Sequence, residues 1–177
     1  MTEENAARRR LGGAAPERLP GVTTDWAGPE ALPGVIGLDH IGLAVADLDA
    51  AVALHTRVLG LVVRHRETNS EQGVEEVMLA PVADGSRTQV QLLAALDERS
   101  PVHRFLARRG PGLHHLAYAV RDVRIASDVL LRQGFRLLYD APRAGTRGSL
   151  INFVHPKDTG GVLIELVESA AQTQGQG

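Results

Sequence analysis

The sequence contains no cysteine, and this absence excludes a disulfide framework and any thiolate chemistry. It also lacks an apolar run near the roughly 20 residues that span a membrane, and its first residues lack the apolar core of a secretory signal. A strong excess of charge of either sign is missing too, because the formal net charge is only −2. We therefore expect a cytoplasmic protein without nucleic-acid or membrane partners.

The composition predicts one globular unit with a polar extension at each end. Of the 177 residues, 44% are hydrophobic and 23% are charged, which are ordinary globular values. Residues 1–34 contain four prolines among alanine, glycine, glutamate and arginine, without apolar periodicity. We predict a disordered extension over residues 1–34, a domain over residues 35–170 and a flexible tail over residues 171–177.

The most informative stretch of the chain is one that occurs twice. LDHIGLAVAD, at Leu38–Asp47, returns 75 positions later as LHHLAYAVRD, at Leu113–Asp122, and this register pairs His40 with His115. Each copy then continues into a helical pattern that ends at a glycine. A repeat of this length exceeds the usual solenoid unit, so it indicates two copies of a small module packed as a pair.

Each copy has the pattern of a β-α-β-β-β module, and the predicted fold class is α+β, with the site in the cavity of the sheet. The strands expected in the first module, about residues 35–95, are 35–45, 61–66, 74–79 and 88–94. Those expected in the second module, about residues 112–168, are 113–120, 135–139, 149–155 and 161–168. Helices are expected within the modules at 48–59 and 122–133, and between them at about 100–110.

The repeat also pairs Gln91, in TQVQLL, with Glu165, in VLIELV, at an offset of 74. If an approximate two-fold axis relates the modules, these two side chains converge on one point with His40 and His115. A carboxylate inside a sheet costs several kcal/mol without a countercharge, and a metal ion supplies one. Imidazole nitrogen with carboxylate or amide oxygen suits a borderline divalent ion, so we predict that these four residues bind one ion per chain.

Simpler interpretations of these residues are open as well. A histidine on an apolar strand is more often a satisfied core residue than a ligand, and the Gln91 amide can simply bond a neighbour. His114 is one position out of phase with the ligand face, so we expect it on the opposite face of the sheet. We assign His65, which has no repeat partner, to a surface or packing role, and Glu168 to a solvated strand end.

Residues 34–168 resemble the vicinal oxygen chelate superfamily and, within it, the methylmalonyl-CoA epimerase family. The superfamily resemblance rests on the paired β-α-β-β-β modules and the four candidate ligands. The closer resemblance rests on the segments LDHIGLAV, EQGVEEVML, TQVQLL, SPVHRFL, RRGPGLHHLAY, INFVHPK and TGGVLIELVE. The sequence departs from the family in its long N-terminal extension and in QLLA, where many relatives have a glutamate after the leucines.

The resemblance implies an enzyme that interconverts (2R)- and (2S)-methylmalonyl-CoA by removing and returning a proton at C2 through an enolate. It also implies a homodimer and one divalent metal ion, for which we expect Co²⁺, with Mn²⁺, Ni²⁺ and Zn²⁺ as alternatives. The family's metal ligands correspond to His40, Gln91, His115 and Glu165. Its further glutamate corresponds to Glu76, so we expect Glu76 and Glu165 to be catalytic, one on each face of the substrate carbon.

Glu76 also stands out without the resemblance, because its repeat partner is Leu150 and a catalytic group added to one module would show such an asymmetry. A solvated glutamate like Glu75 is the alternative. The same scaffold also fits a related acyl-CoA epimerase, a glyoxalase-type isomerase, an extradiol dioxygenase or a metal-free small-molecule-binding protein. Loop cations able to contact CoA phosphates, which we leave outside the site, are Arg143, Arg147 and Lys157.

Overall fold

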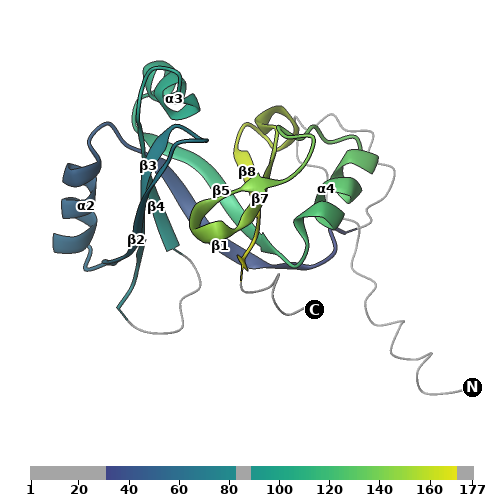
Figure 1. Ribbon diagram of the computed structural model, residues 1–177, viewed down its shortest axis with the longest axis horizontal. Helices are drawn as coiled ribbons and strands as arrows, with labels where there is room; N and C mark the ends of the chain where they lie inside the picture. Colours follow the sequence, from purple (N-terminus) through teal and green to yellow (C-terminus); the bar gives the residue numbers. More distant parts are fainter. Residues whose placement is uncertain (1–30, 83–88, 171–177) are drawn as a thin grey trace, which may run out of the picture.

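The computed structural model describes residues 31–82 and 89–170, so most of the predicted extension and the whole predicted tail lie outside the described residues. A curled sheet organises the described part, with strands in the order β2-β3-β4-β1-β5-β8-β7-β6 (Figure 1). The strands are β1 (Val35–Ala44), β2 (Val62–Asn69), β3 (Val74–Ala80), β4 (Gln89–Ala95), β5 (Gly112–Val120), β6 (Arg143–Ala144), β7 (Leu150–Val154) and β8 (Leu163–Glu168). The helices are α2 (Leu48–Arg57), α3 (Pro101–Arg109) and α4 (Val123–Arg132), with short 3₁₀ turns η2 (Thr146–Gly148) and η3 (Pro156–Asp158).

The two halves of the sheet repeat the same arrangement. β1 pairs in parallel with β4, and its counterpart β5 pairs in parallel with β8. β1 and β5 are antiparallel neighbours at the centre of the sheet, so an approximate two-fold axis passes between them. This topology confirms the predicted α+β fold of two tandem β-α-β-β-β modules.

Helices α2 and α4 begin in the same way, at the aspartate that closes each copy of the repeat. Asp47 accepts the backbone N–H of Ala50 at 2.9 Å, and Asp122 accepts that of Ile125 at 2.9 Å. These side chains satisfy N–H groups that have no partner inside the helix. In the described ranges, no helix is long and apolar enough to cross a membrane.

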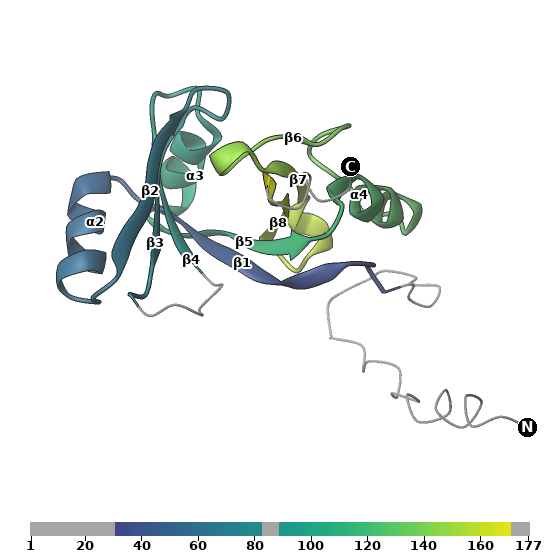
Figure 2. The same cartoon turned by 60° about the horizontal axis from the view of Figure 1, so that its bottom comes forward.

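The outer face of the sheet is apolar and the inner face carries polar groups. Figures 1 and 2 show α2 and α4 at opposite ends of the molecule, with the curled sheet between them. Val77 packs beneath α2, and Leu166 packs beneath α4. Because side chains alternate along a strand, the neighbouring Glu76 and Glu165 point to the inner face. The strand period therefore brings carboxylates from both modules into the concave side of the sheet.

The strand predicted at residues 135–139 is wrong. This segment forms a single bridge, between Leu137 and Val154, and the two-residue strand β6 takes the edge position beside β7. The side chain of Asn152 accepts the backbone N–H of Tyr139 at 3.3 Å and donates to the Tyr139 carbonyl at 3.1 Å. Because this amide takes the hydrogen bonds that a strand partner would supply, the segment does not continue as a strand.

Candidate metal centre and active site

Three of the predicted ligands meet at the seam between the two halves of the sheet. His40 from β1 and His115 from β5 are each 3% exposed, and Glu165 from β8 is 6% exposed. The two Nε2 atoms lie 3.0 Å apart, and Oε2 of Glu165 lies 3.1 Å from each of them. Ligands at adjacent octahedral positions about 2.1 Å from an ion stand about 3.0 Å apart. The spacing of the three atoms therefore fits one shared divalent ion.

The electrostatics of this cluster also fit a cation. Burial lowers the pKa of His40, but hydrogen bonds to Asp39 and Glu165 outweigh burial and raise this pKa to about 9. Burial raises the pKa of Glu165, whereas His115 and His40 lower it to a net value of about 2. The positive charge of the protonated imidazole thus balances the buried carboxylate of Glu165. A divalent cation that displaces the imidazole proton can take over this role.

A β-bulge precedes each of the two histidines and holds its ring. Asp39 is the extra residue in β1, and His114 is the extra residue in β5. Oδ1 of Asp39 lies 2.8 Å from Nδ1 of His40, and Nδ1 of His114 lies 2.9 Å from Nδ1 of His115. Burial and then His115 lower the pKa of His114 to about 4, so its neutral ring can accept a hydrogen bond. In both modules Nδ1 is held by the preceding residue and Nε2 stays available for a metal ion.

The expectation that His114 lies on the opposite face of the sheet is therefore wrong. Its ring lines the same cavity as His115 and packs edge-on against Phe105 of α3. The physical reason is the bulge, because an extra residue interrupts the alternation of side chains on which the expectation depended.

Gln91, from β4, lies beside the cluster and has one atom left for a ligand. The residue is 4% exposed, and within the described residues its Oε1 is the one buried side-chain polar atom without a hydrogen-bond partner. Its Nε2 donates to Oε2 of Glu76 at 2.8 Å and to Oγ1 of Thr146 at 3.2 Å. Unpaired buried polar atoms are rare and costly. The free oxygen fits a cation ligand, while the amide nitrogen holds Glu76 in place.

Glu76, from β3, is buried at 1% exposure and so differs from its solvated neighbour Glu75. Oγ1 of Thr146 donates to its Oε1 at 2.7 Å. Burial is the main cause that raises the pKa of Glu76 to about 7, and the nearby Glu67 raises it further, while Thr146 opposes the shift. A carboxyl group with a pKa near neutral can both take up and return a proton at physiological pH.

The sequence did not indicate three residues around Glu76, two that contact it and one that lies behind them. Glu67 of β2 stands directly opposite Glu76 in the antiparallel register, and the two carboxyl groups share a hydrogen bond. His65 Nε2 in turn bonds Oε2 of Glu67, although the sequence indicated only a surface or packing role for this histidine. The third neighbour, Thr146, comes from the loop between α4 and β7 in the other module. The register of the β2–β3 hairpin would have indicated Glu67, whereas no sequence pattern indicates Thr146.

Two cavities reach the cluster, and Thr146 and Glu165 line both of them. The first, which also touches His115 and Tyr139, has a volume of about 290 Å³. The second, which touches His40, has a volume of about 310 Å³. These volumes are at the lower end of the range of small-molecule sites, about 300–1,000 Å³. They suit a small acyl group better than a whole nucleotide-containing molecule.

We expect Gly42→Ala to expel the His115 ring from the cluster. A Cβ atom on Gly42 would stand 2.2 Å from Cε1 and 2.6 Å from Nε2 of His115, much closer than van der Waals contact. The ring must move, and its Nε2 then no longer faces Glu165. Elemental analysis should show a loss of bound metal, while circular dichroism stays that of the wild type. Full metal content in folded Gly42→Ala would contradict this expectation, because it would show that the His115 ring can bind the ion from a second position.

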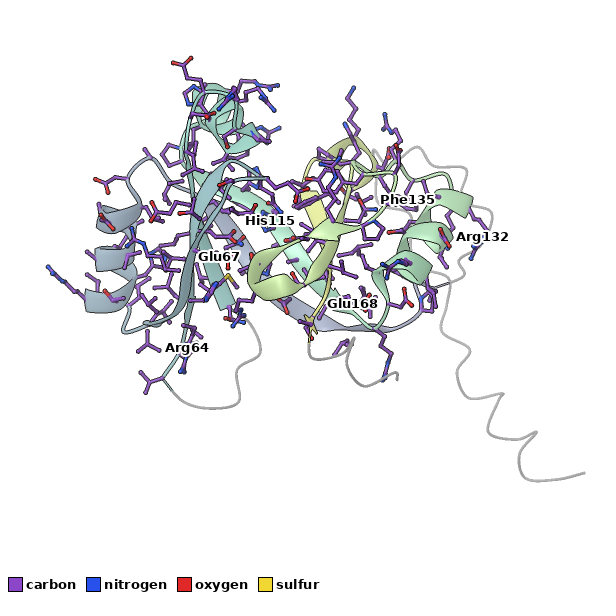
Figure 3. The ribbon with its side chains drawn as sticks, in the orientation of Figure 1. Arg64, Glu67, His115, Arg132, Phe135 and Glu168 are labelled. Carbon is purple, nitrogen blue, oxygen red and sulfur yellow. The ribbon has the colours of Figure 1, made fainter. Side chains whose placement is uncertain are left out.

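Glu168 is not the solvated strand end that the sequence suggested. It is 6% exposed, and its Oε2 accepts the backbone N–H of Val123, the first residue of α4, at 3.0 Å (Figure 3). A carboxylate is favourable at the N-terminus of a helix because the N–H groups there have no helical partner. Glu168 therefore ties β8 to α4 behind Glu165.

Comparisons with known proteins agree with this geometry. Residues 39–153 match the family model of the Glyoxalase/Bleomycin resistance protein/Dioxygenase superfamily. The chain is 48% identical to methylmalonyl-CoA epimerase from Mycobacterium tuberculosis, covering 83% of this chain and 95% of that one with a TM-score of 0.75. It is 46% identical to a methylmalonyl-CoA epimerase solved with methylmalonyl-CoA and NH₄⁺, over 77% and 96% of the chains with a TM-score of 0.73. The ethylmalonyl-CoA/methylmalonyl-CoA epimerase of Cereibacter sphaeroides is 36% identical, over 73% of this chain and 95% of its own.

Proposed function

We propose that the protein interconverts (2R)- and (2S)-methylmalonyl-CoA, because the chain belongs to the methylmalonyl-CoA epimerases. These belong to the Glyoxalase/Bleomycin resistance protein/Dioxygenase superfamily, also called the vicinal oxygen chelate superfamily. The observation that carries this proposal is the buried His40–His115–Glu165 cluster, with Gln91 lining the same cavity as His115 and Glu165 and bonded in turn to Glu76. The cluster provides ligands for a cation, and Glu76 provides a proton carrier beside it.

We propose that one divalent ion binds at this cluster, with His40, Gln91, His115 and Glu165 as its ligands. The free Oε1 of Gln91 and the spacing of the other three ligand atoms support this set. Such an ion, when bound, supplies fixed positive charge for the negative charge that develops on the enolate. Nitrogen and oxygen ligands suit several divalent ions. We propose that the ion is Co²⁺, and that Mn²⁺, Ni²⁺ or Zn²⁺ binds when it is supplied instead.

The protein's own proton carriers in this proposal are Glu76 and Glu165. They come from different modules, on β3 and β8, and so can serve opposite faces of the C2 carbon. Glu76 takes a proton from one face, and Thr146 and Gln91 hold its carboxyl group in position through the hydrogen bonds they donate. Glu165 serves the other face. Both carboxylates are almost fully buried, and this exclusion of bulk water strengthens the electrostatic interactions around them.

Only the acyl end of the substrate fits inside the site, so the CoA portion extends outwards. Arg143 lines the cavity beside His115, with its guanidinium 4.2 Å from the centre of the Tyr139 ring. Arg147 lines the second cavity, whereas Lys157 lines neither. Arg143 and Arg147 are thus better placed than Lys157 to meet CoA phosphates. The homodimer and the cytoplasmic location stay predictions.

Deuterium uptake tests this function directly. In heavy water the metal-loaded protein should incorporate deuterium at C2 of methylmalonyl-CoA while the two epimers equilibrate, and a chelator should stop both processes. Lack of uptake by metal-loaded protein would contradict the proposal. Oxygen consumption with a catechol would instead indicate the dioxygenase alternative.

A further inference from the structure

The proposed epimerisation, on which this inference rests, leaves the two carboxyl groups in exchanged protonation states. When Glu76 takes the proton from C2 and Glu165 supplies the new one, Glu76 ends the turnover protonated and Glu165 ends it ionised. A second turnover in the same direction requires Glu76 to release its proton and Glu165 to take one up. Glu165 lines both cavities and can take up its proton there once the product has left. Glu76 is 1% exposed, so it has almost no direct contact with water. The active site therefore needs a route that carries protons between Glu76 and solvent.

The hydrogen bonds of Glu76 point to one such route. Gln91 donates an amide N–H, which does not ionise at physiological pH, and Thr146 lines the cavity in which we propose that the substrate binds. The remaining partner, Glu67, leads outwards. Its carboxyl group bonds Glu76 on one side and Nε2 of His65 on the other.

Exposure rises along this chain of groups from the interior to the surface. The side chain of Glu67 is 28% exposed, and that of His65 is 31% exposed. Besides Glu76 and His65, Glu67 accepts the backbone N–H of Arg147, a group that does not titrate. Burial raises the pKa of Glu67, but the bonds from His65 and Glu76 outweigh burial and leave this pKa lowered, so Glu67 is ionised and holds a proton from Glu76 only briefly before it passes one to His65.

We propose that Glu67 and His65 form a proton relay that connects Glu76 with solvent between turnovers. The proton leaves the Glu76 carboxyl group for the Glu67 carboxylate, and Glu67 passes a proton from its other oxygen to Nε2 of His65. The imidazolium then releases a proton from Nδ1 to water or buffer, and rotation of the half-exposed ring restores the starting tautomer. No bond to carbon changes, and no oxidant or reductant takes part. Glu67 and His65 are positioning residues, because they act through Glu76 and not on the substrate.

His65→Ala separates the relay from the chemistry itself. With enzyme in excess over substrate, the first turnover of the metal-loaded variant should proceed near the wild-type rate. In the steady state, where Glu76 must reset each time, we expect kcat to fall by at least about 10-fold. Added imidazole should restore kcat of His65→Ala, because a small buffer can occupy the vacated place of the ring. The same imidazole concentration is applied to the wild type to correct for any effect on the metal.

Two further variants complete the test. Glu67→Gln keeps a hydrogen-bonding side chain opposite Glu76 but cannot pass a proton, so imidazole should not restore its kcat. His55→Ala, which removes a helix histidine bonded to the Ala51 carbonyl, should behave as the wild type. Equal slowing of the first turnover and the steady state, or wild-type kcat in both relay variants, would overturn the relay. Lack of deuterium uptake by the wild type would overturn the proposed function instead, so the two failures are distinguishable.

Discussion

Replacement of Glu76 by glutamine lowers epimerase activity by at least about 100-fold and leaves the metal content unchanged. General acid–base groups contribute roughly 10²–10⁴-fold to rates, and a glutamine amide cannot take a proton from C2. The amide occupies the space of the carboxyl group, and its carbonyl still accepts the hydrogen bond that Thr146 donates. Its NH₂ group takes the place of Oε2, which accepts an N–H of Gln91, so that hydrogen bond is lost and the fold should lose about 1–3 kcal/mol. Epimerisation rates and elemental analysis of the same preparation check both statements.

Glu75→Gln is the matched control. Glu75 is the preceding residue on the same strand, and it pairs with Arg66 at the surface, where ion pairs contribute little. This variant should keep wild-type activity. Full activity of Glu76→Gln would remove Glu76 from the mechanism. Because burial raises the pKa of Glu76 to about 7, the wild-type rate should also fall as the pH drops below about 7, where the base is protonated.

Replacement of His115 by alanine removes the metal ion together with the activity. The variant loses one of three ligand atoms that stand about 3 Å apart, and Glu165 loses one of the two histidines that keep it ionised. A cation that stabilises the enolate is worth several kcal/mol, so activity should fall by about 1,000-fold. Elemental analysis should show metal falling from about one ion per chain to near zero.

His103→Ala is the control for this second experiment, because His103 is an exposed residue of α3 and has no place in the cluster. It should keep both metal and activity. The thermal unfolding temperature of metal-free His115→Ala, compared with that of the metal-free wild type, shows whether the variant is still folded. A folded variant without metal has lost a ligand and not its fold. A folded His115→Ala protein that retains one ion per chain would contradict the assignment of His115 as a ligand.

The repeat between the two modules is the part of the sequence that predicts the site most fully. The shared offset paired His40 with His115 and Gln91 with Glu165, and the two-residue period of strands indicated that these side chains share a face. The two-residue period gives the wrong face or the wrong element where a local irregularity breaks it. The bulge at His114 and the Asn152 side chain that bonds Tyr139 are such irregularities, and neither leaves a mark in the apolar pattern.

The duplicated fold and the residues that meet at its two-fold seam follow from the amino-acid sequence alone, because repeated patterning and strand alternation are local properties of the chain. The surroundings of Glu76, in contrast, depend on the folded structure. Glu67 reaches it through the register of the β2–β3 pair, and Thr146 reaches it from a loop of the other module. Such contacts depend on how distant segments close in space, and this closure is set by the packing of the whole sheet rather than by any local pattern.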